Sequence, residues 1–332
     1  DLHSFPTRRS SDLRLGITNS VLKLLIAIII STLHSDKLLV YGFLMAGVSV
    51  FGTMCYIFFC FQKYSSQLSF SKVSFVEMHG VMGFAGWTLL DVTGSMLNRQ
   101  GYAVMLNKFF GPVVNTTFAL SRQIEGHLYT VSSSVIDTIR PQIMASQGAD
   151  NPERVFSLSM SAGKIGFVMM SFIAIPLYVM MPDILDLWLT SVPEGTALFS
   201  RLLIIACMAE QMTRGLVYAN QAIGNIKWFS IIVSGIRTMA LPLSVIVLLC
   251  GKPAYWAIVI FMICEVTGSL SRVFVLSKIA NFNPFPFFYQ VLFKVLPPFI
   301  ISFCICQFLY QPGNDILHML YVALMTVCLY KS

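Results

Sequence analysis

The stretch LLIAIIIS (24–31) decides the fold class, because it is a continuous apolar run and not an alternating one. A membrane β-strand alternates apolar and polar residues over about ten positions, whereas a lipid-spanning helix is apolar along its whole length. Similar runs recur along a chain of 332 residues with a mean hydropathy of +0.75. The pattern predicts an all-α polytopic membrane protein.

The overall composition excludes several soluble classes. The chain is 56% hydrophobic and only 11% charged, against about 25% charged residues in a soluble domain. A soluble protein of this size has too little interior to bury so much apolar surface. We therefore exclude a soluble enzyme, a disordered chain and a nucleic-acid-binding domain. The eight cysteines lie in or beside apolar runs and are expected to pack as small apolar residues.

The apolar runs predict about ten membrane helices, at about 20 residues for each crossing. The third is long, and we extend it through the polar stretch NRQG (98–101) to the turn FFGP (109–112), because Gly-Pro is the stronger helix breaker. The predicted spans cover residues 15–34, 38–61, 77–107, 114–139, 164–182, 196–221, 228–250, 254–277, 289–309 and 315–330.

Lysines and arginines in the loops predict the orientation, because cytoplasmic loops carry an excess of these residues. With residue 15 in the cytoplasm, the outer side holds only Lys37, Lys108 and Lys252. The inner side holds Arg14, Lys63, Lys72, Arg140, Arg154, Lys164, Lys227, Arg272, Lys278 and Lys331. We expect both ends of the chain, and the longest loop (about 140–163), on the cytoplasmic side.

Nine ionisable residues fall inside the predicted spans. A charge at the centre of a bilayer costs about 2.5–3.5 kcal/mol, so nine of them facing lipid would cost on the order of 25 kcal/mol. We therefore expect these side chains to face one another or a water-filled cavity. The bases are Lys23, Arg99, Arg122, Arg214 and Arg237, and the acids are Asp91, Glu125, Glu210 and Glu265.

The fourth span has two distinct faces. One is an apolar stripe with steps of three and four residues, formed by Leu120, Ile124, Leu128, Val131, Val135 and Ile139. The polar residues fall largely off that stripe, and they are Arg122, Glu125, Tyr129, Ser132 and Ser133. Such a polar face lines either a cavity or a tight polar contact between helices.

Two pairs of these charges also have the spacing of intrahelical ion pairs. Arg122 and Glu125 are three residues apart, and Glu210 and Arg214 are four apart. For either pair alone, static pairing and a cavity role both stay open, whereas the whole set favours a cavity. Lys23 and Arg237 have no neighbour of opposite charge in sequence, which makes them the better candidates to bind a substrate anion.

Motifs for covalent or metal chemistry are weak. His79 and His127 are isolated, without a metal ligand three or four residues away. The stretch GKIG (163–166) lacks the spacing of a phosphate-binding loop. We therefore expect neither an enzyme nor a metal site.

The first residues differ from the rest of the chain. DLHSFPTRRSSDL (1–13) is polar and is similar to the translation of a sequencing adapter, so we expect this segment to be non-native. It also lacks the apolar core of a signal peptide. We exclude it from the prediction of the fold.

Four stretches together resemble a known family, the polysaccharide-transporter branch of the multidrug/oligosaccharidyl-lipid/polysaccharide exporter superfamily. This branch comprises bacterial O-antigen and capsule repeat-unit flippases. The stretches are LNKFFGPVVNTTFALSRQIEGHLYTVSSSVIDTIRPQI (106–143), QGADNPERVFSLSMSAGKIGF (147–167), PDILDLWLTSVPEGTALFSRLLII (182–205) and ANQAIGNIKWF (219–229).

The resemblance implies a fold of two six-helix bundles that face each other across a central cavity. Residues 14–62 would be the last two helices of the first bundle, preceded by about four more. Residues 75–280 would form the second bundle, and residues 281–332 a C-terminal helix pair.

The resemblance also implies a function: translocation of a polyprenyl-pyrophosphate-linked oligosaccharide across the bacterial inner membrane by alternating access. From their position within the spans, and not from a family motif, the five bases would bind the pyrophosphate. The four acids would pair with these bases in one state or carry a coupling proton or Na⁺, with no other cofactor. The expected partners are the lipid-linked oligosaccharide, membrane lipid, a polysaccharide polymerase and glycosyltransferases, with no nucleic acid.

Two other functions stay open. A drug/cation antiporter of the same superfamily would favour a cavity dominated by acids and aromatic residues over one with five bases. A membrane-embedded polysaccharide polymerase or ligase would be expected to carry a large outer loop with catalytic Arg or His. The longest predicted loop lies instead on the cytoplasmic side.

Overall fold

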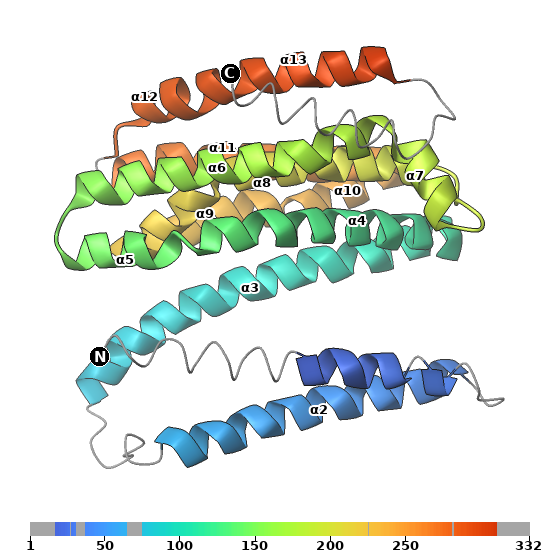
Figure 1. The fold of residues 1–332 in the computed structure, drawn as a ribbon, viewed down its shortest axis with the longest axis horizontal. Helices are drawn as coiled ribbons and strands as arrows, with labels where there is room; N and C mark the ends of the chain where they lie inside the picture. The colour runs from blue at the N-terminus through green and yellow to red at the C-terminus, as the bar shows by residue number, and fades with distance from the viewer. Residues whose placement is uncertain are drawn as a thin grey trace. The chain divides into compact units, whose positions relative to one another are not determined.

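The computed structural model describes residues 17–26, 28–30, 37–64, 75–224, 226–280 and 282–310. These residues form helices and short connections, with no strand among them (Figure 1). They belong to two compact units, residues 1–79 and 80–332. Over the part of the chain that the structure describes, the predicted all-α class is confirmed.

The first unit contains two apolar helical segments. One runs over Ile17–Ile30, and the other is α2 (Lys37–Tyr64). Large apolar side chains of both are exposed, including Leu24 and Phe43. Lys23 is exposed in the same unit. Apolar side chains on the outside of a helix are typical of contact with lipid.

The second unit is a bundle in which α8 is central. α8 packs against α4, α6, α9 and α11, and successive long helices run in opposite directions (Figure 1). The helices are α3 (Phe75–Phe110), which begins just before the division between the units, α4 (Pro112–Asp137), α5 (Arg140–Gly148), α6 (Pro152–Val179), α7 (Met181–Trp188), α8 (Thr196–Ile223), α9 (Ile226–Thr238), α10 (Ala240–Leu249), α11 (Tyr255–Ala280), α12 (Pro284–Phe287) and α13 (Phe293–Leu309). A π-helical turn, Phe288–Leu292, joins the last two.

Six described segments are long and apolar enough to cross a membrane: Leu39–Phe58, Pro152–Val179, Thr196–Ile223, Ile226–Leu249, Tyr255–Ala280 and Pro284–Phe308. The chain is therefore an all-α polytopic membrane protein, while the predicted number of about ten spans is not confirmed. α3 and α4 reach spanning length but are more polar, because they carry several of the charges noted above. The span predicted at 315–330 lies outside the described residues.

The turn chosen as the end of the third span is confirmed. α3 continues through NRQG and ends at Phe110, and Gly111 follows with φ 82°. This left-handed conformation suits glycine, and Pro112 then begins α4. Asp91 and Arg99 therefore both lie within one continuous helix.

The long loop predicted at 140–163 is wrong, because most of this segment is helical. Residues 140–148 form α5, and α6 begins at Pro152, so Lys164 lies well inside α6 and not at its start. The Asn151 side chain accepts a hydrogen bond from the Arg154 N–H (3.0 Å), which caps α6. The first turn of α6 is polar, so a prediction of helices from hydropathy alone does not find it.

The contact between α6 and α8 depends on glycine. A Cβ added at Gly215 of α8 would collide with the backbone carbonyl of Ser159, and one added at Gly163 of α6 would collide with the carbonyl of Met212. Small residues allow membrane helices to approach this closely. The two glycines therefore set the distance between the helices at the centre of the bundle.

Tyr102 joins α3 to α10 and is fully buried. Its hydroxyl lies 2.6 Å from the Ser244 hydroxyl and donates to the Ala240 carbonyl at 3.0 Å. We expect Tyr102→Phe to lower the free energy of unfolding by about 1 kcal/mol, because the ring stays and the interhelical hydrogen bonds are lost. A lower thermal unfolding midpoint in detergent would show this. The matched control is Tyr289→Phe at an exposed ring, and an equal midpoint shift in both variants would contradict the prediction.

Candidate functional site

A cavity of about 820 Å³ lies within the second unit, between α3, α4, α8, α9 and α11. Eleven charged side chains line it. They are the arginines Arg99, Arg122, Arg140, Arg214, Arg237 and Arg272 and the carboxylates Asp91, Glu125, Asp137, Glu210 and Glu265. A polar interior of this kind is unusual for helices whose outer faces are apolar, since ionisable side chains in membrane segments mark functional sites by default.

Helical spacing brings these residues to the cavity. On α8 the lining residues recur at steps of three and four and include Cys207, Glu210, Arg214, Tyr218 and Gln221. This is the periodicity of one helix face. The other helices present comparable faces, so the cavity lies where several polar faces meet.

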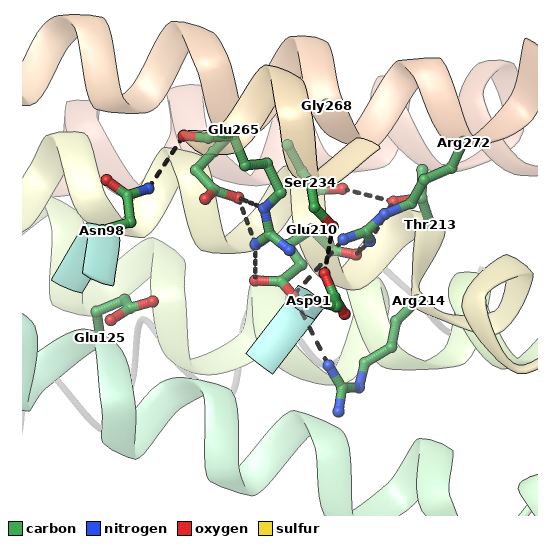
Figure 2. A network of polar contacts seen from close by, with 12 residues as sticks. Asp91, Asn98, Glu125, Glu210, Thr213, Arg214, Ser234, Glu265, Gly268 and Arg272 are labelled. Atoms are coloured by element: carbon green, nitrogen blue, oxygen red, sulfur yellow. Dashed lines mark hydrogen bonds and ion pairs between the residues drawn. The ribbon is translucent and has the colours of Figure 1, made fainter. Parts of the chain in front are cut away.

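Glu210 is the centre of an ion-pair network from three helices (Figure 2). Its carboxylate lies 3.2 Å from Arg237 of α9 and 3.7 Å from Arg214 of its own helix. Arg272 of α11 lies 3.8 Å away. Arg237 also contacts Glu265 of α11 at 2.5 Å, so this arginine bridges two carboxylates.

Arg272 is almost fully buried, and its guanidinium donates to the Thr213 hydroxyl at 3.0 Å. Its Nε has no hydrogen-bond partner among the described residues. Gly268, one turn earlier on α11, leaves room for the side chain of Arg237, because an added Cβ would lie 3.0 Å from its Cγ. The network is therefore packed closely against the α11 backbone.

α3 contributes two further polar contacts to this network. The Asn98 amide donates to the backbone carbonyl of Arg237 at 3.0 Å, and the Ser234 hydroxyl donates to Asp91. The α9–α10 junction lies beside Arg237, where Pro242 removes the N–H that would bond to the Thr238 carbonyl. The Asn98 amide thus bonds to a backbone carbonyl next to the break between α9 and α10.

The ion pairs around Glu210 contain more arginines than carboxylates. Three arginines (Arg214, Arg237 and Arg272) are matched by two carboxylates, Glu210 and Glu265. Burying charges costs several kcal/mol for each ion, and only good geometry with further hydrogen bonds offsets that cost. The presence of these buried charges is therefore weak evidence that they serve only to stabilise the fold.

A separate ion pair lies on α4. Arg122 contacts Glu125 at 3.1 Å, as their spacing of three allows, and the Arg122 guanidinium lies 5.6 Å from the ring centre of Phe261. Arg99 of α3 also lines the cavity, but it is exposed and makes no ion pair with a described carboxylate. The arginines of the cavity thus differ in how far they are neutralised.

A third group lies towards the end of the cavity where α4 meets α5. Arg214 lies over the Tyr129 ring at 4.6 Å and within 5.7 Å of the Tyr218 ring centre. Arg140 lies 5.2 Å from the same Tyr218 ring. The Tyr218 hydroxyl donates to Asp137. Guanidinium groups and aromatic rings alternate here along one wall.

Eight of the nine charged site residues chosen from the sequence line this one cavity, namely Asp91, Arg99, Arg122, Glu125, Glu210, Arg214, Arg237 and Glu265. The ninth, Lys23, lies in the first unit, where it is exposed. The roles of these residues in substrate binding and coupling stay predictions. Among the described residues, no three His, Cys, Asp or Glu side chains gather as a metal site would need.

Sequence reasoning missed Arg272, Asp137 and Arg140. Arg140 and Arg272 had been counted as loop charges, whereas both line the cavity. A signal was present for Arg272, because it follows Glu265 by seven residues, which is two turns and the same face of a helix. Conversely, Ser132 was assigned to the polar face of the fourth span but does not line the cavity. Its hydroxyl donates to the Gly166 carbonyl at the contact between α4 and α6.

The fold and the cavity define a multi-pass, all-α membrane protein with a charged interior. A scan against protein-family models, a search of curated proteins and a search of solved structures find no match to this chain. The resemblance to polysaccharide flippases is therefore still a prediction from the sequence.

Proposed function

We propose that the protein is a flippase that moves a polyprenyl-pyrophosphate-linked oligosaccharide across a bacterial inner membrane by alternating access. The observation that carries the proposal is the cavity of about 820 Å³, lined by six arginines and five carboxylates within a bundle of apolar helices. A polar path enclosed by apolar helices is what a polar headgroup needs in order to cross a bilayer.

The chemistry of the substrate suits this cavity. Pyrophosphate is anionic and is bound well by guanidinium groups, which donate paired, charge-assisted hydrogen bonds. Sugars need polar partners throughout, whereas a polyprenyl chain can stay in the lipid. The small excess of arginine over carboxylate favours an anionic cargo without holding it too tightly to be released.

The carboxylates supply a means of release. Glu210 already contacts three arginines, and Glu265 holds one of them. In the proposed cycle, an arginine leaves its carboxylate to bind the pyrophosphate and returns when the cargo departs. Asp91, Glu125, Glu210 and Glu265 are also the groups that would carry a coupling proton or Na⁺.

A drug/cation antiporter is the second candidate, and one observation favours it. Aromatic rings share the cavity wall with the acids, among them Phe118, Tyr129, Tyr218 and Phe261. Aromatic faces attract organic cations. This function predicts that bound cations, and not anions, would compete for the site.

The test is transport by the protein reconstituted in liposomes. We expect a short-chain polyprenyl-pyrophosphate oligosaccharide, loaded in the inner leaflet, to become accessible to an external glycosidase. Arg237→Ala and Lys23→Ala should each abolish this signal when it is normalised to the amount of protein inserted, because each removes a proposed substrate cation. The matched control is Lys252→Ala, which removes an exposed charge from the loop before α11.

Two outcomes would contradict the flippase. One is normal translocation in both the Arg237 and the Lys23 variants. The other is a wild-type protein that leaves the lipid-linked oligosaccharide in place but exchanges ethidium for protons, which would establish the antiporter instead.

A further inference from the structure

Two arginines at the α4–α5 end of the cavity share a single aromatic ring. The guanidinium carbons of Arg140 and Arg214 lie 5.2 and 5.7 Å from the ring centre of Tyr218. Arg214 is also stacked over Tyr129 at 4.6 Å. All four side chains line the cavity. Two like charges therefore lie against one ring beside an open space.

Both arginines are less neutralised than Arg237, which lies deeper in the network. Arg237 touches Glu265 at 2.5 Å, whereas Arg214 reaches its carboxylate only at 3.7 Å and shares it with two other arginines. Arg140 is exposed, makes no ion pair with a described carboxylate, and donates only to the Gln221 amide oxygen at 3.2 Å.

Asp137 is the carboxylate that lies beside this pair of arginines, and it cancels one of their two charges. It accepts the hydrogen bond of the Tyr218 hydroxyl, which fixes the ring beside both arginines. Counting Arg140, Arg214 and Asp137, the group keeps one positive charge, and Glu210, which also contacts Arg214, is shared with two further arginines. Arg214 Nε donates to the Tyr218 hydroxyl at 3.3 Å and Arg140 Nη2 donates to Gln221, so each guanidinium keeps part of its set of five N–H donors for a further acceptor.

We infer that Arg140 and Arg214 form a binding site for a phosphate or diphosphate group at this end of the cavity, with Tyr218 as the positioning residue. Each guanidinium presents a fork of donors that matches phosphate oxygens, and two forks suit the two phosphates of a diphosphate. The inference deepens the proposed function and rests on it for the chemistry of the cargo.

The location agrees with a loading step. Arg154 and Lys227 lie at the same end of the bundle, next to α5 and at the start of α9. This is the end that the distribution of Lys and Arg predicts to face the cytoplasm. An anionic headgroup arriving from that side would meet Arg140 before the buried network around Glu210.

The test is direct binding to the purified protein in detergent, measured by isothermal titration calorimetry. The probes are inorganic pyrophosphate and geranylgeranyl diphosphate, which distinguish a free diphosphate from a lipid headgroup. We expect Arg140→Ala and Arg214→Ala each to raise the Kd about tenfold, and the double variant about a hundredfold, which at tenfold per 1.4 kcal/mol is about 2.8 kcal/mol. Tighter binding of the lipid probe would identify the headgroup as the source, and equal binding would identify the free anion.

The controls separate binding from folding. Arg154→Ala removes an exposed charge from the same end, outside the cavity lining, and should bind both probes like the wild type. Arg214→Lys keeps the charge without the planar fork and should be intermediate. Tyr218→Phe and Tyr218→Leu both lose the hydroxyl that contacts Asp137 and Arg214, so both should unfold at a lower temperature than the wild type. Only Tyr218→Leu also loses the ring, so it should weaken binding more than Tyr218→Phe does.

The inference is overturned if the double variant binds both probes as tightly as the wild type, or if Arg154→Ala weakens binding by the same factor. Its failure differs from failure of the flippase. If the wild type translocates the lipid-linked oligosaccharide but the double variant still binds diphosphate, only the proposed binding site is overturned. If the wild type binds diphosphate and the double variant does not, but the wild type translocates nothing, the flippase is overturned and the binding site is supported.

Discussion

Glu210→Gln should abolish translocation and lower the free energy of unfolding by about 3–5 kcal/mol, the cost of removing one partner from a buried ion pair. Three arginines lie within 4 Å of the Glu210 carboxylate. In the Gln variant, Glu265 is the carboxylate that still forms an ion pair with one of them, Arg237. Gln keeps the shape of the side chain, so the effect isolates its charge. Thermal unfolding in detergent and the liposome transport assay measure the two consequences.

A second variant tests whether the lost stability comes from unpaired arginine charge. Glu210→Gln combined with Arg272→Gln removes one arginine with the carboxylate, so we expect it to recover part of the lost stability. Glu194→Gln, at an exposed carboxylate before α8, should be neutral. If Glu210→Gln unfolds at the wild-type temperature and still transports, the network is not the centre of the site.

Gly215→Val is expected to prevent α6 and α8 from packing, with a loss of about 3 kcal/mol or more. The added side chain would collide with the Ser159 backbone carbonyl, and backbone cannot move aside as a side chain can. We expect little folded protein by size-exclusion chromatography and no transport, since the wall of the cavity contributed by α8 is displaced.

The matched control for this substitution is Gly235→Ala on α9. An added Cβ there meets no atom within 4 Å, and alanine favours a helix more than glycine does. That variant should therefore fold as well as the wild type. Equal yields of folded Gly215→Val and Gly235→Ala would show that the close approach of α6 and α8 is not required.

The polar faces of the helices could largely be predicted from the sequence. Charged side chains in the middle of α3 and α4 would cost free energy if they faced lipid, so they were expected on a polar face. The spacing of Arg122 and Glu125 already indicated the ion pair seen at 3.1 Å. The polar start of α6 could not be predicted from hydropathy, because Asn151 and Pro152 begin a helix by capping and not by apolar content.

By itself, the sequence determined the fold class, since continuous apolar runs can satisfy their backbone in lipid only as helices. It also determined most of the charges that line the cavity. Only the tertiary structure decided their partners. Arg237 lacked an acidic neighbour in sequence, yet it contacts Glu210 and Glu265 from two other helices. The reason is geometric: periodicity specifies which face of a helix is polar, whereas packing between helices, set here by contacts such as that of Gly215 with Ser159, decides which polar faces meet.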